Sequence, residues 1–284
     1  MITVRAWFFY LFMKIIPKRQ ISRWVGVLMA IERPRWLASS MVKAFASFYR
    51  IDLKEAELPL NAYPSVAKLF TRRLKPGVRP LADAEPLHPA DGKITEWGEV
   101  RQGQLYQVKG TKYSLAKLLH NEAWAQDLEG GLYLTYYLCP TDYHRVHFPV
   151  SGQVTSAAHI SGELWPVNEL SVLRVQGLFA VNERVVVEVI TERGRVVVVM
   201  VGATNVGQMR MSFDGKLVTN QKDQQKGIVR TKQYWPPLRV KAGDELGVFH
   251  MGSTVVVLYP RTFWGEKMNP IQGGPAKIGG SLAL

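Results

Sequence analysis

Two runs rich in β-branched residues restrict the fold of this chain more than any other feature. They cover Arg184–Thr191 and Arg195–Val201, and the short polar segment 192–194 separates them. Valine and isoleucine favour the pleated surface of a sheet, and a short connection that contains glycine favours a hairpin. The chain keeps this strand-like character from about residue 82 onward, with Asp91-Gly92 as a further turn. The pattern predicts an α+β fold whose larger part is β-rich.

The first 50 residues show the periodicity of amphipathic helices instead. Apolar residues recur at i, i+3, i+4 and i+7 in three stretches, which Pro17 and Pro34 separate. The stretches are Phe8, Leu11, Phe12 and Ile15; Trp24, Val27, Leu28 and Ile31; and Met41, Ala44, Phe45 and Phe48. The longest uncharged apolar run, residues 6–13, is far shorter than the ~20 residues of a membrane-spanning helix. We therefore expect short helices that do not cross a membrane.

The positive charge is concentrated in the same part of the chain. Residues 1–80 contain 15 Lys+Arg and 4 Asp+Glu, a net charge of +11, whereas the remaining residues carry only +2 of the total of +13. A nucleic-acid-binding protein can show such a bias, but the accompanying large apolar residues favour an anionic membrane surface. Helices that pack on the protein's own core are the alternative. The residues that we expect to contact the membrane are Trp7, Phe8, Leu11, Phe12, Lys14, Lys18, Arg19, Arg23, Trp24, Val27 and Leu28.

One short motif suggests chemistry that the chain performs on itself. In Gly252-Ser253 the glycine leaves its carbonyl open to close approach, and the serine supplies a hydroxyl. Alone, the motif is more typical of an ordinary turn that enters a strand. His144 and His147, three residues apart, and Asp91 in its tight turn add a base and a carboxylate that could orient it. Together these residues fit a serine that attacks the peptide bond before it.

Other classes of site lack their signatures. The sequence contains no G-x-G-x-x-G, P-loop or G-x-S-x-G motif and no pair of zinc ligands, so we expect no nucleotide site, no metal and no ordinary serine-hydrolase site. We expect no nucleic-acid partner because large apolar residues accompany the basic charge of the first 80 residues. Cys139 is the single cysteine, which excludes a disulfide within the chain.

These segments, in this order, resemble the phosphatidylserine decarboxylase family, whose bacterial members are membrane-associated enzymes with a pyruvoyl group. The likeness covers most of the chain from about Tyr63 onward. It includes the segments 70–77, 108–110, 178–185, 201–207 and 241–247. Met251 departs from the leucine expected in many relatives, but the two side chains are both apolar and similar in volume.

The resemblance implies self-cleavage between Gly252 and Ser253. It assigns His147 as the base and Asp91 as the carboxylate that orients His147 while Ser253 attacks the Gly252 carbonyl. Elimination and hydrolysis would then release ammonia and leave a pyruvoyl group at position 253. The products would be a β chain of residues 1–252 and an α chain of residues 253–284.

The same resemblance implies a carboxy-lyase that converts phosphatidylserine to phosphatidylethanolamine and carbon dioxide. The substrate amine would form a Schiff base with the pyruvoyl group, and His144 is the candidate proton donor. We expect a helical membrane-binding region in residues 1–60 and a β-rich catalytic domain in residues 61–284. The protein would lie peripherally on the cytoplasmic side of the inner membrane, with its α and β chains associated and a homo-oligomer left open.

Two other classes of function stay open. The turns at 91–93 and 242–247 resemble those of lipoyl-type carrier modules, although we find no modifiable lysine in a tight hairpin. A pyruvoyl enzyme for a soluble amino acid would not need the basic amphipathic quarter. An ether-linked archaetidylserine has the same reacting headgroup as phosphatidylserine and is a further alternative substrate.

Overall fold

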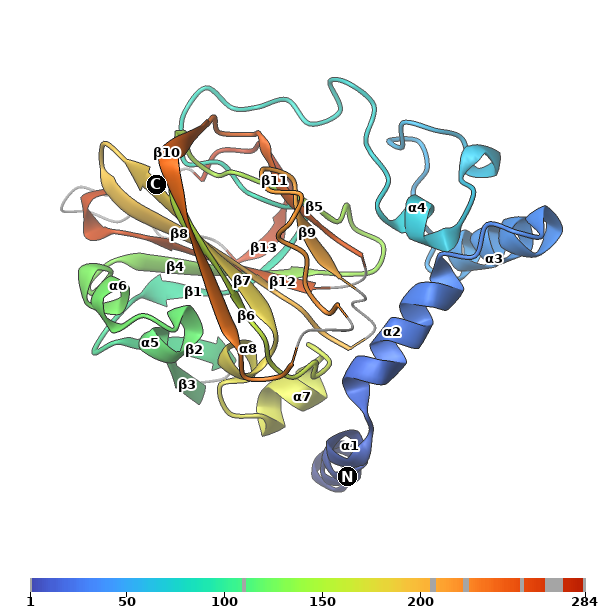
Figure 1. Ribbon diagram of the computed structural model, residues 1–284, viewed down its shortest axis with the longest axis horizontal. Helices are drawn as coiled ribbons and strands as arrows, with labels where there is room; N and C mark the ends of the chain where they lie inside the picture. The colour runs from blue at the N-terminus through green and yellow to red at the C-terminus, as the bar shows by residue number, and fades with distance from the viewer. Residues whose placement is uncertain are drawn as a thin grey trace.

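The computed structural model describes residues 2–108, 111–204, 208–221, 225–250, 253–263 and 273–282. Helices form its N-terminal part and a large antiparallel sheet dominates the rest, as Figure 1 shows. The predicted α+β class, β-rich with N-terminal helices, is confirmed. Among the described residues, none of the helices combines the length and the hydropathy that crossing a membrane requires.

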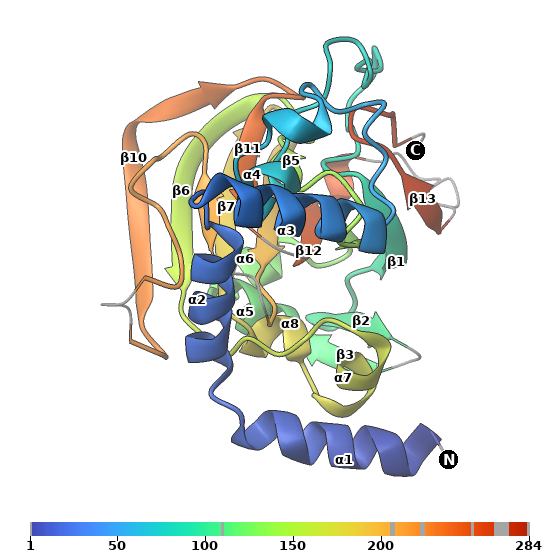
Figure 2. The same cartoon turned by 90° about the vertical axis from the view of Figure 1, so that its right-hand side faces the viewer.

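Three helices open the chain: α1 (Ile2–Ile15), α2 (Lys18–Met29) and α3 (Arg35–Phe48). Pro17 and Pro34 directly precede α2 and α3, where a missing backbone N–H costs no helical hydrogen bond. The three predicted helices and both breaks are therefore confirmed. Figures 1 and 2 show that the helices follow one another along one side of the β-rich body, with α2 leading from α1 to α3.

Thirteen strands are described in the remainder of the chain. They are β1 (Gly92–Glu99), β2 (Gln104–Val108), β3 (Thr111–Ser114), β4 (Leu132–Leu138), β5 (Arg145–His147), β6 (Gly152–Ile160), β7 (Arg184–Thr191), β8 (Gly194–Val201), β9 (Met209–Met211), β10 (Val229–Val240), β11 (Glu245–Phe249), β12 (Ser253–Tyr259) and β13 (Gly274–Ala276). The predicted hairpin is confirmed, because β7 and β8 pair antiparallel from Arg184↔Val201 to Thr191↔Gly194.

The strands form one large sheet and two small ones. The large sheet has the order β10-β6-β7-β8-β12-β4-β1-β13, and each pair of neighbours in it is antiparallel. A three-stranded sheet, β5-β11-β9, and the hairpin of β2 and β3 accompany it. Strand β12, which begins at Ser253, lies inside the large sheet, between β8 and β4.

Two apolar cores cover the two faces of the large sheet. Along β8, Val196 and Val198 belong to one core and Val197 and Val199 to the other, as the two-residue period of a strand requires. The first core includes residues of the three-stranded sheet, and the second includes the short helices. Because both faces are covered, the central strands are continuous apolar runs rather than alternating ones.

Short helices complete the fold. They are α4 (Val66–Phe70), α5 (Leu115–Leu119), α6 (Glu122–Asp127), α7 (Glu169–Arg174) and α8 (Leu178–Val181), with single 3₁₀ turns η1 (Leu60–Ala62) and η2 (Arg261–Phe263). A third core joins α3 to α4 through residues such as Phe45 and Phe70. This core spans the boundary that we expected near residue 60, and the boundary itself stays a prediction.

Candidate active site

The predicted site residues gather at one end of three neighbouring strands. Strand β4 lies between β1 and β12, with Lys93 opposite Tyr137 on one side and Ser253 opposite Leu138 on the other. Asp91 directly precedes β1 and Ser253 begins β12, so two strand spacings, roughly 10 Å, separate their backbones. Met251 and Gly252 lie outside the described residues, and of Ser253 only the backbone is described.

His147 has an imidazole whose protonation the structure defines. Its backbone N–H donates to the Pro89 carbonyl at 2.8 Å, which places His147 close to the turn that contains Asp91. Its Nδ1 lies 2.7 Å from the Gly243 carbonyl oxygen, and its Nε2 lies 3.4 Å from the Tyr143 hydroxyl. Because a carbonyl oxygen only accepts, Nδ1 carries the hydrogen and Nε2 keeps its lone pair. Burial lowers the pKa of His147, so the neutral form, which can act as a base, predominates at neutral pH.

His144 is fully buried at the other end of strand β11. The Phe249 N–H donates to the His144 carbonyl at 3.0 Å, and Phe249 is three residues before Gly252. His147, in contrast, pairs with Glu245, the first residue of β11. The His144 Nδ1 lies 2.9 Å from the Asp142 carbonyl oxygen, and its Nε2 has no hydrogen-bond partner among the described residues. Burial lowers the pKa of His144 to about 3. This environment disfavours a standing positive charge, and the predicted role as proton donor stays a prediction.

Asp91 is buried and has several hydrogen-bond donors around its carboxylate. Arg79 donates from Nη2 at 2.6 Å and from Nε at 3.1 Å, and the Ile278 N–H donates at 2.9 Å. The carboxylate also influences His147 electrostatically and favours its charged form. In this arrangement Gly243, rather than Asp91, accepts the Nδ1 hydrogen of His147. The role of Asp91 as the carboxylate that orients His147 stays a prediction.

Arg79, Tyr143 and Gly243 were missed by the sequence analysis. Arg79 lies two residues after segment 70–77, which carries part of the family resemblance. An arginine in a loop belongs to no helix or strand periodicity that would mark it in the sequence. Gly243 acts through its carbonyl, a group that every residue possesses. All three residues line a hollow of about 420 Å³, and His147 lines the same hollow.

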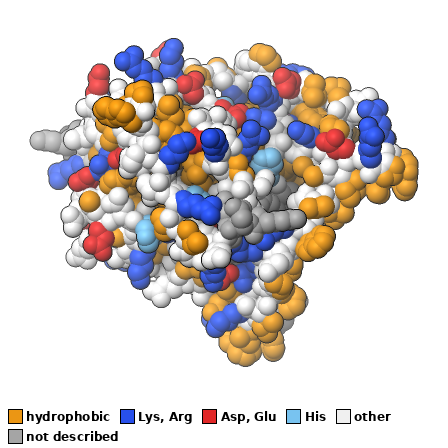
Figure 3. Space-filling model, viewed as in Figure 1, with side chains coloured by type: hydrophobic (Ala, Val, Ile, Leu, Met, Phe, Trp, Pro, Cys, Tyr) orange, Lys and Arg blue, Asp and Glu red, His pale blue; other side chains and the backbone are white. Residues whose placement is uncertain are grey.

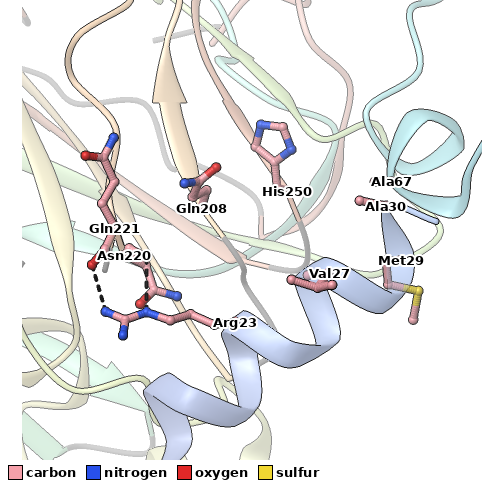
Figure 4. A pocket seen from close by; sticks show the side chains of 10 residues that line it. Arg23, Val27, Met29, Ala30, Ala67, Gln208, Asn220, Gln221 and His250 are labelled. Atoms are coloured by element: carbon pink, nitrogen blue, oxygen red, sulfur yellow. Dashed lines mark hydrogen bonds between the residues drawn. The ribbon is translucent and has the colours of Figure 1, made fainter. Parts of the chain in front are cut away.

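A second hollow, of about 500 Å³, lies between α2 and the sheet next to His250 (Figure 4). Its apolar lining includes Val27 and Met29 from α2. Its polar lining consists of Arg23, Gln208, Asn220, Gln221 and His250. The sequence analysis assigned His250 no role, although His250 directly precedes Met251 and the cleavage motif.

The expected membrane contacts divide into two groups. The exposed side chains are Trp7, Phe8, Phe12, Lys14, Trp24, Val27 and Leu28, and Leu11 is half-buried. Figure 3 shows hydrophobic side chains gathered over α1 at the bottom and along the helices at the right. The exposed apolar set is arranged as a membrane contact requires, and its contact with a membrane stays a prediction.

The expectation for three cations needs correction, because Lys18, Arg19 and Arg23 face the protein. Lys18 is 5% exposed and lies 3.8 Å from the Glu163 carboxylate. Arg19 donates to the Ser161 hydroxyl at 3.1 Å and lies 3.9 Å from the buried Glu183 carboxylate. Arg23 donates to the Gln221 carbonyl at 2.7 Å. Lys18 Nζ also donates to the Met13 carbonyl of α1 at 2.7 Å. The other partners named here lie on the β-rich body, far away in the sequence, where periodicity cannot reveal them.

Known proteins resemble the chain over nearly its whole length. Residues 66–283 match the phosphatidylserine decarboxylase family. Phosphatidylserine decarboxylase proenzymes of Anaeromyxobacter sp. (strain K) and Methylobacillus flagellatus are 43% and 42% identical to it, each alignment covering 87% of this chain and 87–88% of the relative. A proenzyme of the same description from Pseudomonas aeruginosa is 41% identical over 95% of this chain and 94% of its own. The chain thus belongs to the phosphatidylserine decarboxylase family.

Proposed function

We propose that the protein is the proenzyme of a phosphatidylserine decarboxylase, which cleaves itself at Gly252-Ser253 and then converts phosphatidylserine to phosphatidylethanolamine and carbon dioxide. The observation that carries the proposal is the family match, since residues 66–283 include the glycine-serine pair, both histidines and Asp91. The common location of Asp91 and Ser253 at one end of the sheet supports it.

Self-cleavage begins with proton transfer from Ser253. The Nε2 lone pair of His147 accepts the hydroxyl proton, and the Asp91 carboxylate stabilises the resulting imidazolium. The serine oxygen attacks the Gly252 carbonyl, the imidazolium protonates the nitrogen as the C–N bond breaks, and an ester replaces the amide. Loss of the Ser253 α-proton to a base then expels the Gly252 carboxylate and leaves a dehydroalanine at position 253. Water then converts the tautomeric imine to a ketone and releases ammonia.

The position of Ser253 fits a pyruvoyl group. Ser253 is the first residue of β12, and from this position onward the strand pairs with β4. A cut before Ser253 therefore leaves the strand's pairing intact and the new terminus in place. A pyruvoyl group there supplies the electron sink for decarboxylation of an amine substrate. His144, next to Phe249, is the candidate to handle the proton that replaces the lost carboxylate.

The hollow beside His250 is where we place the lipid headgroup. A phospholipid has a charged headgroup and apolar chains, and this hollow offers polar side chains toward the sheet and Val27 and Met29 toward α2. Burial lowers the pKa of His250, and the positive charges of Arg210 and Lys68 lie close enough to lower it further. Such surroundings favour a phosphate. The exposed apolar side chains of α2 would contact the acyl chains of the lipid.

The exposed apolar residues of α1 and α2 attach the protein to the membrane. They enter the interface while the β-rich body stays in water, as in other proteins bound through amphipathic helices. This arrangement corresponds to a peripheral protein on the cytoplasmic side of the inner membrane, where its lipid substrate is present. It also favours phosphatidylserine over a soluble amino acid, which needs no attachment.

Intact mass and denaturing electrophoresis test the cleavage. Purified wild-type protein separates into chains of residues 1–252 and 253–284, and the smaller chain resists Edman sequencing because its terminus is a ketone. Ser253→Ala stays a single chain. Active wild-type protein that remains uncut would rule out the pyruvoyl assignment.

A substrate assay separates the alternatives. Carbon dioxide release is measured from phosphatidylserine vesicles, from an ether-linked analogue and from free serine. We expect release from the vesicles and none above background from free serine. Turnover of free serine alone would favour the soluble-substrate enzyme, and cleaved protein without any turnover would contradict the proposed activity.

A further inference from the structure

The carboxylate of Asp91 is held by a cation that the proposed mechanism does not yet use. Asp91 is 2% exposed, and a buried carboxylate without a counter-ion is protonated rather than charged. Arg79 contacts both of its oxygens, with Nε 3.1 Å from Oδ1 and 3.2 Å from Oδ2 and Nη2 2.6 Å from Oδ2. The Ile278 N–H donates to Oδ1 at 2.9 Å, and Lys277 Nζ lies 3.3 Å from Oδ2.

Arg79 is itself fixed between two carboxylates. Its Nη2 also lies 2.6 Å from Glu55 Oε2, and its Nη1 lies 3.1 Å from Glu55 Oε1. The Lys75 N–H donates to the Glu55 carbonyl at 2.9 Å, which ties the segment that carries Arg79 to that of Glu55. Glu55 is on the outer side of this pair, since its side chain is 38% exposed and that of Asp91 only 3%. Arg79 thus has one buried and one solvent-facing partner.

We propose that Arg79 is the positioning residue of self-cleavage: it keeps the buried Asp91 carboxylate charged and oriented beside His147. A charged Asp91 stabilises the imidazolium that forms when His147 takes the Ser253 proton, whereas a neutral carboxylic acid does not. Glu55 holds the outer side of the guanidinium, and its negative charge acts against that of Asp91 rather than for it. The inference rests on the proposed roles of Asp91 and His147.

Charges from several elements act on Asp91. The charged and titratable groups that interact with it electrostatically are Arg79, Lys277, Glu55, Arg72, Asp142, Tyr143 and His147. Burial acts to raise the pKa of Asp91, but hydrogen bonds from Arg79 and Ile278 outweigh it, and the net shift is downward. Removing Arg79 should therefore raise the pH at which Asp91 loses its charge.

Arg79→Gln is compared with Glu55→Gln as the matched control, because each variant breaks one side of the same pair. Freshly synthesised full-length protein is followed by denaturing electrophoresis from about pH 3.5 to about pH 8, because the wild-type pKa of Asp91 lies below its ordinary value and histidine titrates near the middle of this range. We expect Arg79→Gln to slow cleavage about tenfold or more at neutral pH and to move the acid limb of its pH profile upward by about one unit. Glu55→Gln should not move the acid limb upward, because it removes a negative charge near Asp91 and leaves Arg79 in place.

Arg79→Lys keeps the charge with fewer donors, and it should restore part of the rate. It also serves if Arg79→Gln fails to fold, which circular dichroism reports: an acid limb of Arg79→Lys above that of wild type then supports the inference, and an unchanged one overturns it. Equal slowing by Arg79→Gln and Glu55→Gln without a shifted limb would show a merely structural ion pair.

Parallel variants distinguish the inference from the proposed function. Asp91→Asn should be uncut or cut very slowly. If Asp91→Asn is slow while Arg79→Gln cleaves normally, the role of Arg79 is wrong and the proposed function stands. If Asp91→Asn cleaves like wild type, the roles of Asp91 and Arg79 both fail, and cleavage of Ser253→Ala would contradict the proposed function itself.

Discussion

His144 and His147 each present Nδ1 to a backbone carbonyl oxygen, at 2.9 and 2.7 Å. This contact makes Nε2 the basic atom of both residues, and burial lowers both pKa values. Their surroundings differ, because Nε2 of His147 meets the Tyr143 hydroxyl while the ring of His144 lies 3.9 Å from that of Phe70. The environment of His147 is the one that suits a base.

Replacing each histidine separates the two roles. His147→Ala should abolish or greatly slow self-cleavage, because Ser253 loses its base. His144→Ala should still cleave at least in part but decarboxylate poorly, by about 10²-fold or more if proton transfer is lost. Electrophoresis reports cleavage, and carbon dioxide release per cleaved chain reports decarboxylation. The opposite pattern would exchange the roles of the two histidines. This alternative has structural support, because His144 is hydrogen-bonded to Phe249, three residues before Gly252.

Burial of neutral His144 should make stability depend on pH. The unfolded chain binds a proton to His144 below about pH 6.5, whereas the folded chain binds it only near pH 3. Stability from this residue is therefore complete above about pH 6.5 and decreases as the pH falls toward 3. Urea midpoints of Ser253→Ala should fall more between pH 7 and 5 than those of the Ser253→Ala/His144→Gln double variant. Equal losses would show that His144 is protonated in the folded protein.

Sequence analysis proposed candidate groups for the site but not their contacts. Asp91, His144, His147 and Ser253 were chosen for their chemistry, and their segments meet at one end of the sheet. The partners of those groups depend on tertiary neighbours: Gly243 reaches His147 only through the packing of β5 against β11. The role of Arg79 can be inferred only from the structure, which shows the buried Asp91 carboxylate beside it.

Helix α2 illustrates the same limit for a whole element. Proline positions and apolar spacing predicted its existence and its bounds to within a few residues, because both are local properties. The direction of its cations was mispredicted, since Glu163 and Glu183 lie more than 130 residues away in sequence. Arg19 also joins a buried group in which the His159 Nε2 lies 2.8 Å from a Glu183 carboxylate oxygen. The helix is thus docked on the body by polar contacts on one side and leaves apolar residues on the other.

Weakening this docking should loosen α2. Arg19→Gln removes the cation next to the buried Glu183, and we expect a loss of about 1–3 kcal/mol in the free energy of unfolding. Limited proteolysis should cut faster near α2. Lys43→Gln, at an exposed position of α3, is the control and should change neither measurement. If both variants behave like wild type, the contacts of Arg19 do not hold the helix in solution.

The whole molecule combines a β-rich body, whose large sheet has an apolar core on each face, with N-terminal helices that expose apolar side chains. Phe8 and Phe12 are each more than 60% exposed, and Trp24 is 73% exposed. Exposed aromatic residues on consecutive helices are unfavourable in water and typical of an interaction surface. Charge alone did not identify this surface, because three of its expected cations bind the body instead.

Membrane binding should therefore depend more on apolar area than on charge. The variant Phe8→Ser/Phe12→Ser should cosediment several-fold less with anionic vesicles while its self-cleavage stays unchanged, because helix α1, which carries both residues, lies outside the large sheet (Figure 1). High salt should weaken wild-type binding without abolishing it. Unaltered binding of the folded variant would place the contact elsewhere.

The inclusion of β12 within the large sheet has a consequence for the processed protein. The smaller product would supply a strand with partners on both sides and with Val255, Val256 and Val257 in the two cores. It cannot dissociate unless the sheet opens, so the two fragments should melt in a single cooperative transition and remain one particle in native gels. The pieces expressed separately should each lack a complete core, and they should gain native structure only when mixed. Cutting would then alter the covalent connectivity of the molecule without altering its folding unit.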